Sequence, residues 1–296
     1  MQAEKKFDQA EGLRRLLVRP SLRVVTIVGA RQGLGATSVV VNLAVAMSRA
    51  GKQVLVLDEN LAPDNVAQGL GLKPRFDLLN AIRNELTWRE VLLQARNGVS
   101  VLPVARAMQT VNAMNEVERE RLLECLNAAS WGMDAVLVDA CTDGNSVCAG
   151  LSGDEPLLLV VNATTEGITE SYALLKQLAA QTGRRTFDLV FNKTSSEQQA
   201  HTVFDNMQLL AQTSLQVTLQ YMGHIPKDGN MLISGKAQRA LLDMMPASPA
   251  SRALAEMAEK LILQPPTEQE GCNTLNHLMQ RLLQQKPARR VMLATR

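Results

Sequence analysis

The chain has 296 residues, of which 46% are hydrophobic and 20% charged, and its formal net charge is +2. This is enough for a full hydrophobic core and suits one globular α/β domain with short extensions. Aromatic residues make up only 3% of the chain, which argues against binding single-stranded nucleic acid by base stacking. Neither an apolar run of membrane-spanning length nor a signal-peptide core is visible, so we expect a cytoplasmic protein. From the scarcity of aromatic residues we also expect no nucleic-acid partner.

The N-terminal segment, residues 1–22, is predicted to be a helical extension. Apolar residues recur in it at helical spacing, and Pro20 then ends the pattern. These residues are Phe7, Ala10, Leu13, Leu16 and Leu17.

Residues 23–263 are predicted to form a doubly wound α/β domain with a mostly parallel sheet. Candidate strands are 23–28, 53–58, 99–103, 134–139, 156–161, 186–191 and 217–222. Most are continuous apolar runs, which is typical of parallel strands buried on both faces. The stretches between them, such as 116–128 and 168–178, have helical periodicity, and strands that alternate with helices indicate this fold class.

The first predicted strand runs into a glycine-rich loop and then a helix, as a phosphate-binding loop requires. The usual pattern for such a loop is G-x-x-x-x-G-K-[ST]. The last glycine is present as Gly35 and the hydroxyl residue as Thr37, but Ala36 occupies the lysine position and Ala30 the first glycine position. The sequence therefore predicts nucleotide contacts without the usual lysine charge, from Gly33, Gly35, Thr37 and Ser38.

Two aspartates, Asp58 and Asp139, end the second and fourth predicted strands. Parallel strands bind ligands beyond their carboxyl ends, where the loop also lies. A carboxylate in that place can hold Mg²⁺ directly or through water. We therefore expect a magnesium site at Thr37 and Asp139.

Residues 264–296 are predicted to be a linker followed by a basic amphipathic tail. Pro265, Pro266 and Gly271 favour the linker. The tail has five basic and no acidic residues from position 272 onward, and its apolar residues are Leu275, Leu278, Met279, Leu282 and Leu283. This pattern fits an anionic membrane surface, and it equally fits a helix that packs on the protein's own core.

The loop and the strand-terminal aspartates resemble the ParA/MinD group of dimeric P-loop ATPases. In that group the loop reads x-G-K-G-G-V-G-K-[ST], and the alignment places Arg31 at the early lysine, which reaches across the dimer, and Ala36 at the second. Asn60 stands where the group has the aspartate that positions the attacking water. The resemblance implies ATP or ADP with Mg²⁺ and a homodimer. The departures imply weakened nucleotide binding and weak or absent hydrolysis, and they leave open whether nucleotide still binds.

The N-terminal residues narrow the resemblance to the FlhG/FleN (YlxH-type) regulators of flagellar number. Asp8, Gln9, Ala10, Leu13 and Arg14 are similar to the D-Q-A-x-x-L-R motif of those proteins, which stimulates the GTPase FlhF. Further along, Asn192 matches the asparagine that reads adenine in the family. The resemblance covers residues 7–263.

Two functions remain open from the sequence. The first is a regulator of flagellar number or placement that binds an FlhF-type GTPase, and with it a flagellar transcription activator or a C-ring protein. The second is a working MinD-type ATPase that dimerises with ATP at the inner face of the cell membrane. In the second, Arg31 takes over the function of the missing lysine, and Arg31, Asp58 and Asn60 stand at the family's catalytic positions.

Overall fold

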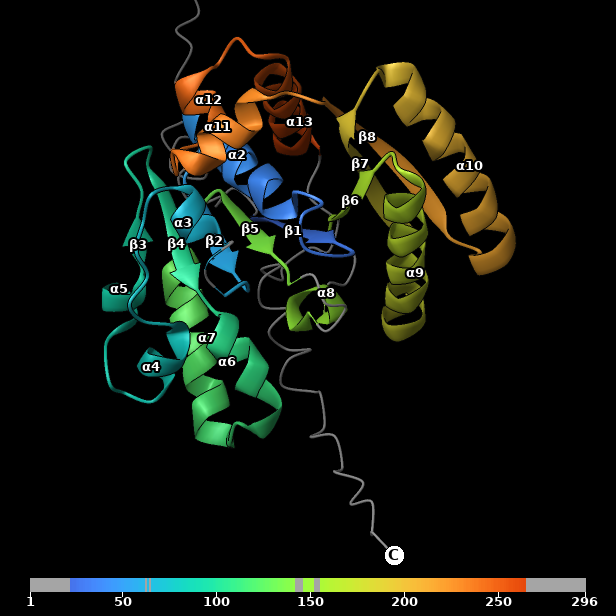
Figure 1. The fold of residues 1–296 in the computed structure, drawn as a ribbon. Helices are drawn as coiled ribbons and strands as arrows, with labels where there is room; N and C mark the ends of the chain where they lie inside the picture. The colour runs from blue at the N-terminus through green and yellow to red at the C-terminus, as the bar shows by residue number, and fades with distance from the viewer. Residues whose placement is uncertain (1–21, 62, 64, 142–145, 152–154, 265–296) are drawn as a thin grey trace, which may run out of the picture.

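The computed structural model describes residues 22–61, 63, 65–141, 146–151 and 155–264. The expected partner-binding helix before residue 22 and the expected membrane-binding tail after residue 264 lie outside these residues. Within the described part, a single sheet is covered by helices on both faces (Figure 1). The doubly wound α/β fold expected from the sequence is confirmed.

The sheet has eight strands in the order β3-β4-β2-β5-β1-β6-β7-β8. All neighbouring strands are parallel except β3 and β4. Their bounds are β1 (Arg23–Gly29), β2 (Val54–Asp58), β3 (Leu93–Gln94), β4 (Val99–Pro103), β5 (Ala135–Asp139), β6 (Leu157–Asn162), β7 (Thr186–Thr194) and β8 (Thr218–Pro226). The seven expected strands are present with ends shifted by a few residues, and the two-residue β3 is an addition.

Helices connect the parallel strands, and the last three helices of the described part follow β8. They are α2 (Ala36–Arg49), α3 (Val66–Gly69), α4 (Leu78–Ile82), α5 (Trp88–Val91), α6 (Ala105–Thr110), α7 (Glu116–Ser130), α8 (Val147–Leu151), α9 (Thr165–Thr182), α10 (Glu197–Leu215), α11 (Asn230–Lys236), α12 (Leu241–Met244) and α13 (Pro249–Leu263). A short 3-10 helix spans Val111–Ala113. Four of the long helices begin at a side-chain cap that accepts a backbone N–H: Asn115, Thr164, Ser196 and Ser248.

The buried core divides according to the alternation of side chains along the central strands. Val25 and Ile27 of β1 face α2 and α13 in one apolar cluster. On the other face, Val24 packs in the cluster that includes α4 and α7, and Val28 packs in the cluster of α9 and α10. Because both faces are covered, the central strands contain almost only apolar residues, which is why they were recognisable in the sequence.

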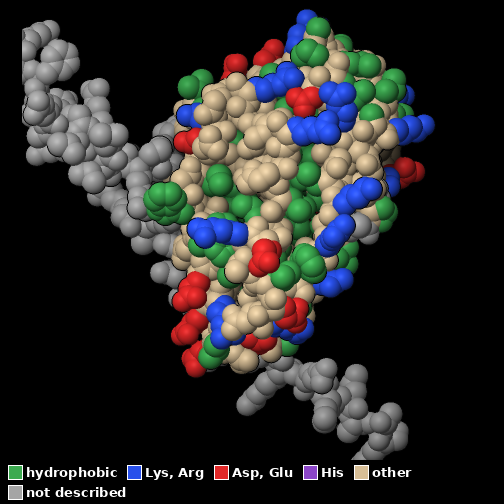
Figure 2. Space-filling view, turned by 90° about the vertical axis from the view of Figure 1, so that its left-hand side faces the viewer, with side chains coloured by type: hydrophobic (Ala, Val, Ile, Leu, Met, Phe, Trp, Pro, Cys, Tyr) green, Lys and Arg blue, Asp and Glu red, His purple; other side chains and the backbone are tan. Residues whose placement is uncertain are grey.

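One edge of the sheet ends in the short antiparallel strand β3. Figure 2 shows the molecule from this side, with Lys and Arg side chains spread over much of the face and several acidic side chains gathered at its lower left. Arg89 and Arg96, which flank β3 in the sequence, are exposed. A very short edge strand with charged neighbours discourages pairing with other chains.

The strand order places the candidate site at the carboxyl ends of β1, β2 and β5. Strand β5 lies between β2 and β1, and Asp58 and Asp139 are register partners at the ends of their strands. The loop that follows Gly29 at the end of β1 therefore lies at the carboxyl ends of the strands, as both carboxylates do.

Candidate functional site

The glycine loop between β1 and α2 has the backbone conformation of an anion-binding nest. Gly33 and Gly35 have φ values of 87° and 97°, a left-handed conformation that favours glycine. Gly35 also starts α2, and no side chain caps this helix, whereas α7, α9, α10 and α13 are all capped. A Cβ on Gly35 would lie 2.4 Å from the amide nitrogen of Asn192. The first N–H groups of α2 thus fit a phosphate group.

Thr37 and Asp139 meet beneath this loop, as the sequence predicted for a magnesium site. The Thr37 hydroxyl donates to Oδ2 of Asp139 over 2.9 Å. The other carboxylate oxygen, Oδ1, is buried without a hydrogen-bond partner. A hydroxyl and a free carboxylate oxygen are donors that Mg²⁺ accepts. The described residues contain no group of three or more His, Cys, Asp and Glu side chains suited to a metal, so these two would need water and phosphate oxygens to complete the shell.

The cations near the loop differ from those of the usual pattern. Ala36 is buried, with its methyl group close to Gly29. Arg31, which the alignment places at the early lysine that reaches across the dimer, pairs its Nε with Glu170 of α9 at 2.5 Å in this single chain. Lys193, which matches the basic residue after the adenine-reading asparagine in the family but for which no role was expected, donates its ammonium to the carbonyl of Gly33 over 2.7 Å.

Asn192, expected to read adenine, contacts the loop itself. Its amide nitrogen donates to the carbonyl of Leu34 over 2.8 Å, and its amide oxygen accepts the N–H of Lys193. Ser38 is exposed at the first turn of α2. Asn192 therefore stabilises the left-handed turn that presents the first N–H groups of the helix.

Asn60 joins the end of β2 to the end of β5. Its side-chain amide donates to the carbonyl of Asp139 over 3.1 Å, and its backbone N–H donates to Oδ1 of Asp58. An aspartate at position 60 could not donate to that carbonyl and would add a third carboxylate beside Asp58 and Asp139. The residue that replaces the expected catalytic aspartate therefore has a structural contact that requires an amide.

Glu59 extends this junction and was missed in the sequence. Its side chain is 5% exposed. The carboxylate accepts the N–H groups of Val147 at 2.9 Å, Cys141 at 3.2 Å and Cys148 at 3.4 Å, together with the hydroxyl of Ser146. We call Asp58, Glu59 and Asn60, with their partners at 139–148 in the described part, the β2–β5 junction.

The electrostatics of the junction follow from burial. Burial raises the pKa of Asp58 to about 6, although backbone hydrogen bonds from Ala67 and Asn60 act to lower it. Burial, and then the neighbouring Asp58, raises the pKa of Asp139 well above its usual range. The pKa of Glu59 is also raised by burial, although its four donors oppose this shift. Carboxyl groups that are buried near one another favour the protonated form.

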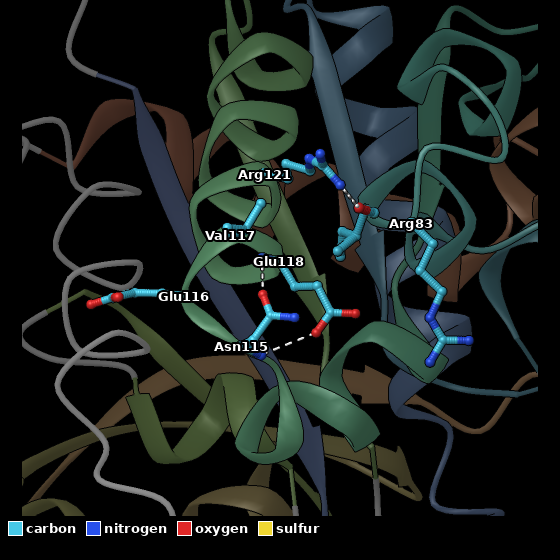
Figure 3. Close-up of a pocket in the computed structure, with 7 residues that line it drawn as sticks. Arg83, Asn115, Glu116, Val117, Glu118 and Arg121 are labelled. Atoms are coloured by element: carbon cyan, nitrogen blue, oxygen red, sulfur yellow. Dashed lines mark hydrogen bonds between the residues drawn. The ribbon is translucent and has the colours of Figure 1, made fainter.

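A separate hollow of about 650 Å³ lies at the start of α7 and contains none of these residues. Figure 3 shows Asn115 and Glu118 bonded to each other's backbone as a capping box. Arg121 donates to the carbonyl of Ile82. These polar groups stabilise the ends of two helices, so the hollow is not the candidate site.

A glycine loop that leads from the first strand into an uncapped helix, with carboxylates at the ends of β2 and β5, defines a P-loop protein of the doubly wound type. The family described as cellulose biosynthesis protein BcsQ matches residues 22–262. The antiactivator FleN of Pseudomonas aeruginosa is 32% identical over 241 residues, which cover 81% of this chain and 86% of that protein. The chain belongs to the ParA/MinD family of P-loop ATPases and, within it, to the FlhG/FleN type, with an altered phosphate-binding loop.

Two further proteins are similar to this chain, the first in sequence and the second in fold. The flagellum site-determining protein YlxH of Helicobacter pylori is 20% identical over 249 residues, which cover 81% of this chain and 82% of that protein. The septum site-determining protein MinD of Pyrococcus horikoshii, solved with Mg-ADP, has the same fold, with a TM-score of 0.59 at 18% identity, covering 81% of this chain and 96% of that one. No helix in the described part of the chain is long and apolar enough to span a membrane.

The raised pKa of Asp58 predicts a pH-dependent stability. An unfolded aspartate titrates near pH 4, whereas the folded pKa is about 6, so the folded state holds more protons between these values. The stability from this proton is complete below about pH 4 and is lost as the pH rises through 6. In urea unfolding from pH 4 to 7.5, Asp58→Asn should reduce this loss by roughly 2 kcal/mol.

Asp58→Asn also loses a hydrogen bond, and this loss lowers stability by a similar amount at every pH. The informative quantity is therefore the slope of the free energy of unfolding against pH. Asp205→Asn, on the exposed surface of α10, is the matched control. Parallel pH profiles for wild type and Asp58→Asn would contradict the assignment of this titration to Asp58.

Proposed function

We propose that this protein regulates flagellar number or placement through protein–protein contacts, with little or no ATP hydrolysis. The proposal of little or no ATP hydrolysis is supported by one contact of Asn60. This residue stands at the place of the expected catalytic aspartate, and its amide donates to the carbonyl of Asp139. An amide cannot accept a proton from an attacking water as a carboxylate can. The proposed role therefore relies on binding partners.

The flagellar part of the proposal is supported by two relatives and one motif. The relatives are named antiactivator FleN and flagellum site-determining protein YlxH. The motif at Asp8, Gln9 and Ala10 resembles the FlhF-activating segment and precedes the region that matches the BcsQ family, which begins at residue 22. Because that motif belongs to the FlhG/FleN type, it favours an FlhF-type GTPase as partner. A flagellar transcription activator or a C-ring protein is proposed as a further partner.

Weak nucleotide binding is supported by the altered loop. A hydrogen bond between a charged group and a phosphate contributes roughly 1.5–3 kcal/mol, so the loss of lysine at position 36 corresponds to about 10–150-fold in affinity. Arg31 is engaged with Glu170 and offsets this loss only if that ion pair opens. The uncapped start of α2 and the Thr37–Asp139 pair remain suited to ATP or ADP with Mg²⁺. If a nucleotide and Mg²⁺ bind there, the Mg²⁺ would neutralise charge on the phosphates.

The alternative is a MinD-type switch that dimerises with ATP at the inner face of the cell membrane. The intact backbone of the loop supports it, because Gly33 and Gly35 keep the required conformation. Size-exclusion chromatography separates the two proposals. An ATP-driven change from monomer to dimer favours the switch, and an unchanged elution volume favours the regulator.

The partner-binding proposal is tested with Gln9→Ala in the full chain. This variant should lose stimulation of an FlhF-type GTPase, because it removes the glutamine of the D-Q-A motif, while its thermal unfolding stays the same. GTP hydrolysis by the partner is the measurement. Glu4→Ala, upstream of the motif, is the control and should stimulate as wild type does; full stimulation by Gln9→Ala would reject the assignment.

The tail proposal is tested by deleting residues 272–296. The deletion removes five basic residues and the apolar series that begins at Leu275, so binding to vesicles with anionic lipid should fall. Sedimentation with vesicles of anionic or neutral lipid is the measurement. Undiminished binding by the truncated protein would show that the tail does not attach the protein to membranes.

A further inference from the structure

Lys193 lies at the rim of the glycine loop, at a point that the family pattern does not assign to a phosphate-binding cation. It is exposed at the end of β7, and its ammonium donates to the carbonyl of Gly33 over 2.7 Å. An ammonium has three donors, and one carbonyl uses only one of them. The remaining donors are available to an anion in the loop.

The backbone of β7 is irregular at this residue. In a regular strand, neighbouring side chains point to opposite faces of the sheet. Lys193 has a left-handed φ of 57°, and the pairing with β8 shifts register between Asn192 and Thr194. As a result, Asn192 and Lys193 both contact the loop, at Leu34 and Gly33. A non-glycine residue rarely adopts this conformation, so the surrounding structure must hold it there.

The two positions at which the family pattern has lysine supply no free cation in this structure. Position 36 holds a buried alanine. Arg31 pairs with the carboxylate of Glu170. No carboxylate of the described residues forms an ion pair with Lys193, so its charge remains uncompensated beside the loop.

The loop itself provides independent evidence for an anion and its metal. Helix α2 starts at a left-handed glycine without a side-chain cap. Oδ1 of Asp139 is fully buried and unpaired next to the Thr37 hydroxyl. A nucleoside diphosphate or triphosphate with Mg²⁺ would satisfy both features, since phosphate oxygens bind N–H groups and Mg²⁺ binds carboxylate oxygen.

We propose that Lys193 supplies the positive charge for the phosphates of a bound nucleotide, in place of the lysine that position 36 lacks. The four-carbon side chain moves its ammonium from the Gly33 carbonyl to a phosphate oxygen, which is a stronger acceptor because it is charged. The cation thus comes from the end of β7 instead of from the first turn of α2. This inference concerns nucleotide binding alone and does not depend on the flagellar role.

The test is titration calorimetry of Mg-ATP and Mg-ADP against the full chain. Lys193→Ala should weaken binding about 10–150-fold, whereas Arg31→Ala should change it less than about threefold, as expected for an exposed paired group. Lys193→Gly removes the same charge without the cost of a left-handed side chain, so it should lose affinity with unimpaired folding. Lys176→Ala, at an exposed lysine of α9, is the control and should bind as wild type does.

A rescue variant completes the experiment. Adding Ala36→Lys to Lys193→Ala should restore affinity, because it returns a cation to the loop. Wild-type affinity in both Lys193 variants would overturn the proposal, as would the absence of binding by the wild-type chain at millimolar nucleotide. Either result leaves the partner-stimulation experiment with Gln9 unaffected, so the two proposals fail separately.

Discussion

The hydrogen bonds between the ends of β2 and β5 are the constraint on which the site depends. The Glu59 carboxylate is buried, and burying a charge is costly unless it is hydrogen-bonded. Three backbone N–H groups and one hydroxyl from residues 141–148 satisfy it. Asn60 adds the bond from its amide to the carbonyl of Asp139. The segments that follow the two strands are therefore joined by the chain's own side chains.

This junction also determines what chemistry the site can perform. The loop of residues 30–35 keeps the glycine conformations and the open helix start that bind phosphate. Asn60, however, uses its amide in the junction, and Ala36 contributes no charge. Preorganised charge at the transferring phosphate is the main source of catalysis in phosphoryl transfer. The site thus retains features suited to binding an anion, and it lacks the lysine and the aspartate that the ParA/MinD pattern has at positions 36 and 60.

The fold was predictable because its signals are local. Continuous apolar runs marked the parallel strands, and Gly35 and Thr37 marked the loop. The two-residue β3 has no such signal, since its pairing with β4 depends on the hairpin between them. The ends of β7 and β8 extended beyond the apolar runs because backbone pairing continues through polar residues such as Asn192.

The side chains of the site were only partly predictable, because their roles arise from contacts distant in sequence. Thr37 and Asp139 are hydrogen-bonded as expected, because Asp139 ends β5 and Thr37 lies in the first turn of the helix that follows β1. Glu59 is one of 29 acidic residues, and nothing nearby in the sequence shows that its donors come from residues 141–148. Arg31 was placed by alignment at the lysine that reaches across a dimer, and its pairing with Glu170, 139 residues away in the sequence, had no sequence signal. The position of Lys193 depends on a left-handed residue in a strand, which no sequence pattern predicts.

Hydrogen–deuterium exchange of the Val147 and Cys148 amides tests most directly whether the chain's own side chains join β2 to β5. Both N–H groups donate to Glu59, so they should be protected to the same degree with and without Mg-ATP. Glu59→Ala should remove that protection, whereas Glu118→Ala, at the start of α7, should leave it unchanged. Protection of these amides that develops only when Mg-ATP is added would contradict a junction built by the chain alone.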